Sequence, residues 1–173
     1  MAFAETELEL RAWLDHLAIQ GLINRHCDAV TRADWQQLEA LYAPEAIWEI
    51  PALGLRYDGV TALVEMLQET STFDVLILTP HAPVISLIDS DHAQATTTIH
   101  EWMRGVSPVD TTGPDIKKGQ QANREFYGIY YDDIARIDRE WKFSHRLYVP
   151  IYTGEGCVTG DVLTPRSGLL RPE

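Results

Sequence analysis

The clearest fold signal in this sequence is the stretch REFYGIYYDDIARIDREWKFSHRLYVPIY (124–152). Two runs rich in aromatic and β-branched residues flank the charged tripeptide Asp138-Arg139-Glu140. Such runs on either side of a short polar turn predict an antiparallel β-hairpin. If the turn centres on Arg139, the numbers of paired residues sum to about 278.

This register places charged and aromatic side chains opposite one another. The predicted pairs are Asp132–Arg146 and Tyr130–Tyr148 on one face and Asp133–His145 on the other. A pair such as Asp132–Arg146 is more often a structural ion pair than a catalytic one. The Asp133–His145 pair fits the rim of a sheet better than a pocket. A one-residue slip would move all of these side chains to the other face, so the pairs test the predicted hairpin closely.

A second hairpin is predicted upstream, where HAPVISLI (81–88) and HAQATTTIHEWMRGV (92–106) flank a turn centred on Ser90. The numbers of paired residues then sum to about 181, which puts His81 opposite His100. The neighbours of His100 on that face are Thr98 and Trp102. Because His81 begins an apolar strand, we expect its ring to face the core or a pocket.

Helices are predicted before the strands. Apolar residues in 7–32 recur at three- and four-residue steps, which is typical of an amphipathic helix. Asp34 is placed to cap a second helix over residues 35–42. A third helix is predicted over residues 60–69, and residues 107–121 form a long polar loop.

Helices followed by antiparallel strands indicate an α+β fold. We expect a curved antiparallel sheet wrapped around the N-terminal helices, forming a cone with an internal pocket. The length of 173 residues suits a single core. We therefore predict one domain over residues 1–152 and a C-terminal tail over residues 153–173, which could cover the pocket, extend an oligomer interface or be loose.

Composition narrows the range of partners. The formal net charge of -12 argues against binding to nucleic acid or to an anionic membrane. We see no secretory signal and no apolar stretch as long as a membrane span, so we expect a cytoplasmic protein. No metal-binding or nucleotide-binding motif is present. A small-molecule substrate without a cofactor or metal is the expectation, and Cys27 is expected to be a buried packing residue.

Three stretches resemble the SnoaL-like branch of the NTF2-like superfamily. They are residues 19–48, residues 80–87 and GIYYDDIARIDREWKFSHR (128–146). They occur in the family's order, and the last is similar to its G-x-Y-x-D…R-x-D-x-x-W pattern. Within the superfamily, the sequence is most similar to the scytalone dehydratase and lindane dehydrochlorinase group. The resemblance implies the NTF2-like cone but specifies function less closely, because this fold hosts dehydratases, isomerases, hydrolases and binding modules.

The resemblance also implies roles for individual residues. Enzymes of that group pair a strand histidine, which removes a proton, with an aspartate on the first helix, and they need no cofactor. His81 matches the histidine, Trp48 matches a pocket tryptophan, and Arg146 matches an arginine that stabilises the leaving group. Thr31 stands where the aspartate is expected. A hydroxyl can accept the ring N–H but cannot offset the charge of an imidazolium.

Two other residues could compensate for Thr31. Asp28 lies one turn earlier on about the same helix face, so it either orients His81 or is a solvated acid. His26 matches the position of a polar pocket residue and could supply acid–base function. The catalytic site implied by the resemblance therefore either uses one of these residues in place of the aspartate or is lost.

From these observations we expect a cofactor-independent lyase, catalysing dehydration or a retro-aldol-type elimination, or an isomerase. Its substrate would be small, largely apolar and ring-containing, with His81 as general base. The candidate catalytic residues are His81, Asp28, Arg146 and His26. The candidate substrate-binding residues are Thr31, Trp48, His100, Trp102, Tyr127 and Tyr148.

Two other readings remain open. One is a non-catalytic protein that binds a small molecule in a degenerate site, which Thr31 favours. The other is a subunit that only scaffolds an oligomer, since the resemblance also implies a homodimer or a larger homo-oligomer.

Overall fold

The computed structural model describes residues 2–70, 73–106, 121–158, 160–164, 166 and 169. The helices are α1 (Ala2–Arg32), α2 (Trp35–Ala40) and α3 (Val60–Thr70), with a short 3₁₀ turn at Pro51–Leu53. The strands are β1 (Tyr42–Ile50), β2 (Leu55–Asp58), β3 (Val75–Pro80), β4 (Val84–Leu87), β5 (His92–Val106), β6 (Gln121–Ile137) and β7 (Glu140–Cys157). Most of the expected loop, 107–120, lies outside the described residues.

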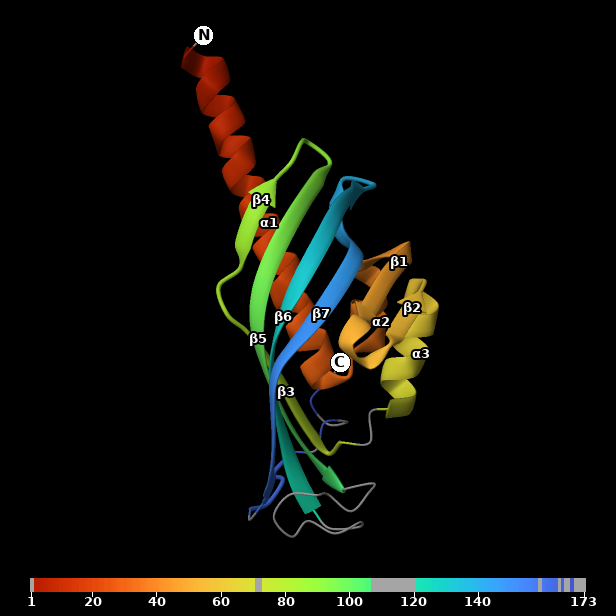
Figure 1. The fold of residues 1–173 in the computed structure, drawn as a ribbon. Helices are drawn as coiled ribbons and strands as arrows, with labels where there is room; N and C mark the ends of the chain where they lie inside the picture. Colours follow the sequence, from red (N-terminus) through yellow and green to blue (C-terminus); the bar gives the residue numbers. More distant parts are fainter. Residues whose placement is uncertain are drawn as a thin grey trace.

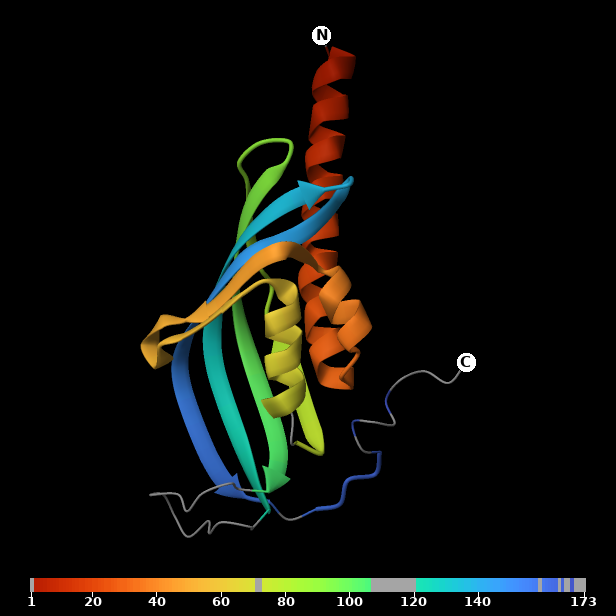
Figure 2. The same cartoon turned by 90° about the vertical axis from the view of Figure 1, so that its right-hand side faces the viewer.

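The seven strands form one curved sheet in the order β2-β1-β7-β6-β5-β3, and β4 also pairs with β5. The three helices lie against its concave side (Figures 1 and 2). This arrangement confirms the α+β fold. One strand pair departs from the expected antiparallel arrangement: β1 and β7 run parallel, whereas every other strand pair within the described residues is antiparallel.

The β6–β7 hairpin has the predicted register. The pairs Asp132–Arg146, Tyr130–Tyr148 and Asp133–His145 are all present. A bulge after Asp133 then pairs Ile134 with Phe143, which turns Phe143 into the core, where it is fully buried. β7 continues to Cys157, so the strand passes the expected domain boundary at residue 152.

The predicted pairing of His81 with His100 was wrong. β4 is one residue out of the expected register, with Val84 opposite Thr96. The residue opposite His100 is Thr79, which belongs to β3. Residues 81–88 do not form the single strand that was expected; instead, the short strands β3 and β4 pair with successive lengths of β5. His81 lies in the connection between them, and only its backbone N–H bonds to β5, at Thr98.

Side-chain contacts between helix α1 and the sheet begin at Asp15, which accepts hydrogen bonds from Arg136 and Trp141, and fully buried residues begin at Ile19. The N-terminal part of α1 extends beyond the sheet in both views (Figures 1 and 2). Leu10, Leu14 and Leu17, which the periodicity assigned to the buried face, are therefore exposed. No helix within the described residues is long and apolar enough to span a membrane.

The start of α2 matches the prediction, because the Asp34 side chain accepts a hydrogen bond from the Gln37 backbone N–H at 3.0 Å. Its end was misplaced. The helix stops at Ala40 instead of residue 42, and Tyr42 already begins β1. The consequence for function is that Tyr42 faces the interior, where it is almost fully buried.

Candidate active site

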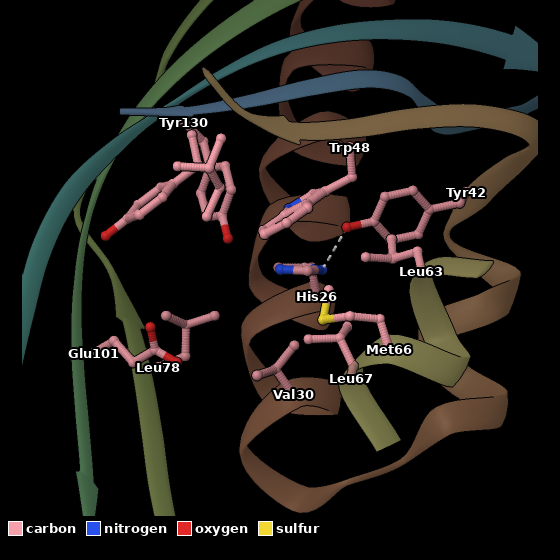
Figure 3. Close-up of a pocket in the computed structure, with 12 residues that line it drawn as sticks. His26, Val30, Tyr42, Trp48, Leu63, Met66, Leu67, Leu78, Glu101 and Tyr130 are labelled. Atoms are coloured by element: carbon pink, nitrogen blue, oxygen red, sulfur yellow. Dashed lines mark hydrogen bonds between the residues drawn. The ribbon is translucent and has the colours of Figure 1, made fainter. Parts of the chain in front are cut away.

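A cavity of about 150 Å³ lies between the concave side of the sheet and helices α1 and α3 (Figure 3). Most of its wall is apolar. The apolar lining residues are Val30, Trp48, Ile50, Leu63, Met66, Leu67 and Leu78. The lining residues with polar groups are His26, Tyr42, Glu101, Tyr130 and Tyr148. A small number of polar groups in an apolar cavity is typical of a site for a small ligand.

A buried polar network, formed by Asp132, Arg146, Tyr42 and His26, leads from the sheet to the cavity. Arg146 Nε and Nη2 donate to the two carboxylate oxygens of Asp132 at 2.7 and 3.1 Å. Its third nitrogen, Nη1, donates to the Tyr42 hydroxyl at 3.3 Å. That hydroxyl lies 3.2 Å from His26 Nδ1. All four residues are buried, so water does not screen these contacts.

The network fixes the tautomer of His26. A guanidinium can only donate, so the oxygen of Tyr42 accepts from Arg146 and its O–H is free to donate to Nδ1. The pKa of His26 is well below its usual value, because burial and the nearby Arg146 charge both disfavour the imidazolium. The neutral ring then carries its proton on Nε2, which points away from Tyr42 into the cavity (Figure 3).

Arg146 keeps its charge inside the core. Burial alone would lower the pKa of its guanidinium, but Asp132 and two nearby tyrosines keep that pKa above its usual value. The guanidinium also lies between two aromatic rings, 4.0 Å from the Tyr130 centroid and 3.9 Å from the Phe143 centroid. Arg146 therefore lies behind the cavity wall rather than on it.

Glu101, on β5, reaches the cavity from the side opposite His26 (Figure 3). Burial raises the pKa of its carboxyl to about 7, and the charge of Arg166 offsets part of that rise. At neutral pH the carboxylate and the carboxylic acid are both well populated. This group can therefore take up or release a proton within the cavity.

Tyr148 contributes a hydroxyl that has no hydrogen-bond partner among the described residues, although it is buried. Burial raises the pKa of this phenol to about 12, so it stays protonated and can donate. Its ring packs on Gly128, where the Cβ of any other residue would overlap the ring. An unpartnered buried hydroxyl in a cavity wall is available to a ligand.

The structure brings three predicted residues together at the cavity: His26, Trp48 and Tyr148. It does not bring His81 there, because His81 is exposed. Its ring makes no hydrogen bond or ion pair with any described residue. Asp28 is not directed at His81 either: it binds Arg32 at 2.6 Å and Gln37 at 3.1 Å, and the contact with Arg32 lowers its carboxyl pKa. The expectation that Asp28 orients His81 is thereby corrected.

Thr31 ties helix α1 to the sheet. Its Oγ1 accepts the backbone N–H of Leu78 at 3.0 Å, and the Leu78 side chain lines the cavity. The strand residue opposite Thr31 is therefore a leucine. Neither residue of this pair can titrate, so the histidine–aspartate dyad implied by the resemblance is not formed at this place.

His100, Trp102 and Tyr127 lie on the other face of the sheet. Along β5 the buried residues are odd-numbered, as with Ile99 and Met103, whereas His100 and Trp102 alternate with them. The His100 ring stacks on Tyr127 with centroids 4.5 Å apart. None of the three lines this cavity, and their expected role in substrate binding stays a prediction.

Glu101 and Tyr42 were missed from the sequence. The signal for Glu101 was available, because an acid stands between Ile99 and Met103 on the apolar side of an alternating strand. Tyr42 was hidden by the misplaced end of α2. Cys27 is buried as expected, and burial raises its thiol pKa to about 12, so the thiol is unreactive. Within the described parts of the chain, no three His, Cys, Asp or Glu side chains are grouped to hold a metal ion.

A family model described as the SnoaL-like domain matches residues 11–147, which confirms the resemblance drawn from the sequence. None of the curated proteins compared with the chain matches it. Among solved structures, a hexachlorocyclohexane dehydrochlorinase, LinA type 2, has a TM-score of 0.73 at 16% identity, covering 89% of this chain and 97% of its own. A related dehydrochlorinase, LinA-type3 from Novosphingobium barchaimii, has a TM-score of 0.71 at 15% identity, covering 89% and 98%. A proposed scytalone dehydratase from Novosphingobium aromaticivorans has a TM-score of 0.69 at 16% identity, covering 94% and 98%. At these identities the likeness establishes the fold alone.

Proposed function

The chain belongs to the SnoaL-like domain family, and we propose that it is a cofactor-independent lyase or isomerase that removes a proton next to a carbonyl group. In this proposal Glu101 is the acid–base residue, and His26 donates a hydrogen bond to the carbonyl oxygen. The observation that carries the proposal is a carboxyl with a pKa of about 7 opposite a neutral imidazole in an apolar cavity. Titratable groups shifted in this way within one cavity are typical of acid–base sites.

The reaction would begin at Glu101. Its carboxylate takes a proton from the carbon next to the carbonyl, the C–H electron pair forms a C=C bond, and negative charge develops on the oxygen. His26 Nε2–H donates to that oxygen. The protonated Glu101 then returns the proton to another carbon, which completes an isomerisation, or to a departing hydroxide, which leaves as water and completes a dehydration.

The buried polar network makes the Nε2–H of His26 a stronger hydrogen-bond donor. Arg146 draws electron density from the Tyr42 oxygen, so the Tyr42 O–H becomes a better donor to His26 Nδ1. An imidazole that accepts a stronger bond at Nδ1 donates more strongly from Nε2. Arg146 thus acts through Tyr42 and His26, rather than on a leaving group as the resemblance implied.

The cavity limits the substrate class. A volume of about 150 Å³ accommodates a single six-membered ring. The walls of leucine, isoleucine, valine, methionine and tryptophan side chains favour an apolar ring. The free hydroxyl of Tyr148 can bind a second oxygen on that ring. The proposed substrate is therefore a small cyclic ketone that carries a hydroxyl or a second carbonyl.

A binding protein is the second candidate. The observation that favours it is the contact between Thr31 and Leu78, which occupies the place where the resemblance implies a catalytic dyad. Such a protein would hold the same class of ligand, through His26 and Tyr148, without moving a proton.

Deuterium exchange distinguishes the two candidates. The protein is incubated in D₂O with a panel of small cyclic ketones and β-hydroxy ketones, and NMR follows loss of the α-proton signal and formation of new products. We expect exchange or elimination well above the solvent rate, falling about 10²–10⁴-fold in Glu101→Gln. Glu125→Gln is the matched control, because Glu125 is a half-buried glutamate that binds His100 on the outer face. Turnover by Glu101→Gln at the wild-type rate would overturn the assignment, and binding without exchange would favour the binding protein.

A further inference from the structure

A second cavity, of about 430 Å³, lies between helix α1, helix α2 and the turn that joins β6 to β7. It shares no lining residue with the candidate active site. Its charged lining residues are Arg25 on α1, Arg136 near the end of β6, Arg139 in the turn and Glu140 at the start of β7. The whole chain has only 14 lysines and arginines against 26 acids. Arginines are therefore concentrated at this cavity in an otherwise acidic protein.

Arg136 and Trp141 form a fixed wall of the cavity. The Arg136 Nη2 and the Trp141 Nε1 both donate to the Asp15 carboxylate, at 2.7 and 3.2 Å. The Arg136 guanidinium lies 4.2 Å from the centroid of the Trp141 ring, and its Nε donates to the Ser90 carbonyl at 2.9 Å. Its Nη1 donates to no described residue. One edge of a guanidinium that is already held in place is thus available to a ligand.

Arg25 and Arg139 are held less tightly. Both residues are exposed, and neither guanidinium makes a hydrogen bond or an ion pair with any residue in the described ranges. Gln37 donates to the backbone carbonyl of Arg25 at 3.0 Å and does not engage its side chain. An unpaired guanidinium in a cavity wall can bind an oxyanion through two parallel N–H bonds.

The backbone of the β6–β7 turn is an independent observation. Asp138 and Arg139 are the two central residues of this turn, and their φ angles are 51° and 71°. Two-residue hairpin turns with positive φ at both positions favour glycine at the second, because a Cβ is disfavoured there. An arginine at this position makes the turn less stable than a glycine would. This cost favours a functional role for the Arg139 side chain.

The acidic groups around the cavity do not cancel its arginines. Asp15 compensates the charge of Arg136, and Asp91 lies 3.6 Å from the Nε of the same arginine. Glu140 is the only acidic lining residue within the described part of the chain, and it can compensate just one of the other two arginines. The cavity wall therefore keeps a net positive charge in a chain whose net charge is -12.

We propose that this cavity is a binding site for a phosphate group, whose oxygens are bound by Arg25, Arg136 and Arg139. Three guanidiniums that come from a helix, a strand and a turn suit the three oxygens of a tetrahedral phosphate better than the two of a planar carboxylate. The volume of about 430 Å³ also leaves room for a small organic part attached to the phosphate. This site does not depend on the proposed function.

Calorimetric titration of the full chain at constant ionic strength tests the proposal. The probes are phenyl phosphate, inorganic phosphate and benzoate. We expect saturable binding of phenyl phosphate and weaker binding of benzoate. Tighter binding of phenyl phosphate than of inorganic phosphate would support a phosphate ester as the ligand, and equal affinities would support free phosphate. Absence of saturable binding of both phosphate compounds, or tighter binding of benzoate, would overturn the proposal.

NMR locates the bound probe. Phenyl phosphate should shift the Nε–H resonance of Arg136 and the indole N–H resonance of Trp141, which lie at this cavity. The indole N–H of Trp48 is the matched control, because Trp48 lines the candidate active site. Shifts at Trp48 without shifts at Arg136 and Trp141 would place the probe in the other cavity and overturn the proposal.

Arg139→Gly separates binding from folding, because it removes the guanidinium and also relieves the positive φ. The affinity for phenyl phosphate should fall about 10–100-fold. The midpoint of thermal unfolding should stay the same or rise. Asp138→Gly is the matched control, since it relieves the same kind of backbone conformation at a residue that does not line the cavity, and its affinity should not fall. Wild-type affinity in Arg139→Gly would overturn the proposal.

Two further variants keep the test valid if changes in the turn disturb the hairpin. Arg25→Gln alters an exposed position on α1 and should weaken binding by a similar factor. Glu140→Gln removes the acid from the cavity lining and should strengthen binding. Affinities that are unchanged in both variants would show that the charge of this cavity does not bind the probe, and would overturn the proposal.

Discussion

The hydroxyl oxygen of Tyr42 lies 3.2 Å from His26 Nδ1, and this contact connects a fully buried ion pair to the cavity. Tyr42 belongs to the first strand and His26 to the first helix, so the contact forms only when the helix packs into the curved sheet. It determines which nitrogen of His26 carries the proton, and therefore whether the cavity contains a donor or an acceptor at that point.

Tyr42→Phe removes this contact and keeps the ring. We expect the free energy of unfolding to fall by about 1 kcal/mol and the His26 side chain to become a mixture of tautomers. The ¹⁵N chemical shifts of the imidazole report the tautomer, and denaturant unfolding reports the stability. Turnover of a substrate identified by deuterium exchange should fall about tenfold, since a weaker donor contacts the developing charge.

Tyr131→Phe is the control for this prediction, because Tyr131 lies on β6 with half of its side chain exposed. It should change neither the tautomer nor the turnover. A His26 ring that keeps the proton on Nε2 in Tyr42→Phe would show that Tyr42 does not set the tautomer.

Asp132→Asn leaves the Arg146 guanidinium in the core without its compensating charge. Both residues are almost fully buried, and their contact distances are 2.7 and 3.1 Å. Breaking a buried pair by removing one partner typically lowers the free energy of unfolding by about 3–5 kcal/mol. Chemical denaturation should show a loss of this size. Asp58→Asn breaks the exposed pair with Arg56 and should change little, so equal losses in the two variants would contradict the prediction.

The hairpin of β6 and β7 could be predicted because two long alternating runs flank a short turn, which leaves few registers. The bulge that turns Phe143 inward could not be predicted, because the alternation of apolar and polar residues does not show where a strand contains one extra residue. The predicted pairing of His81 with His100 was wrong for a related reason. Residues 75–87 contain enough apolar residues for one strand or two, and an error of one residue was sufficient to misplace a histidine.

For the site, too, residues marked by nearby sequence could be predicted, and residues placed by long-range contacts could not. Glu101 could have been found by its place on the apolar side of β5. Tyr42 depended on whether α2 ended two residues earlier, and element ends are the least certain part of a sequence prediction. Arg166 contacts α1 across more than a hundred residues of sequence, and nothing in the sequence around Arg166 predicts that it is buried. Long-range contacts of this kind follow from the assembled fold.

The raised pKa of Glu101 should make the free energy of unfolding depend on pH. Its pKa rises from an ordinary value of 4.5 to about 7 on folding, so the folded protein binds more protons than the unfolded chain between these values. The Glu101 contribution to the free energy of unfolding is therefore full below about pH 4.5 and is lost as the pH rises through about 7. His26 acts in the opposite direction, because its lowered pKa costs stability as the pH falls below its usual value of 6.5.

The comparison of wild type with Glu101→Gln separates the two effects, since His26 is present in both. Relative to the wild type, Glu101→Gln should gain stability progressively between pH 5 and pH 8, by up to about 3 kcal/mol. Urea denaturation at a series of pH values measures this difference. A difference that does not change with pH would show that the Glu101 pKa is close to its ordinary value.

Gly128→Ala tests the packing of Tyr148 against β6. The Cβ of an alanine at this position would overlap the ring and the hydroxyl of Tyr148, so the ring has to move into the cavity. We expect the free energy of unfolding to fall by about 1–3 kcal/mol, as for other overpacked cores. The affinity for a cyclic ketone should fall as well, because the displaced ring occupies space within a cavity of about 150 Å³.

Gly21→Ala is a matched control, because a Cβ at that position in α1 meets nothing within 4 Å. Alanine is favoured over glycine within a helix, so this variant should be more stable by about 0.5–1 kcal/mol and bind the ligand normally. The double variant Gly128→Ala/Tyr148→Ala should recover part of the stability lost through the overlap, relative to the sum of the two single changes. Strictly additive losses would show that Gly128 and Tyr148 do not constrain each other, and the hydroxyl position in the cavity would then need another explanation.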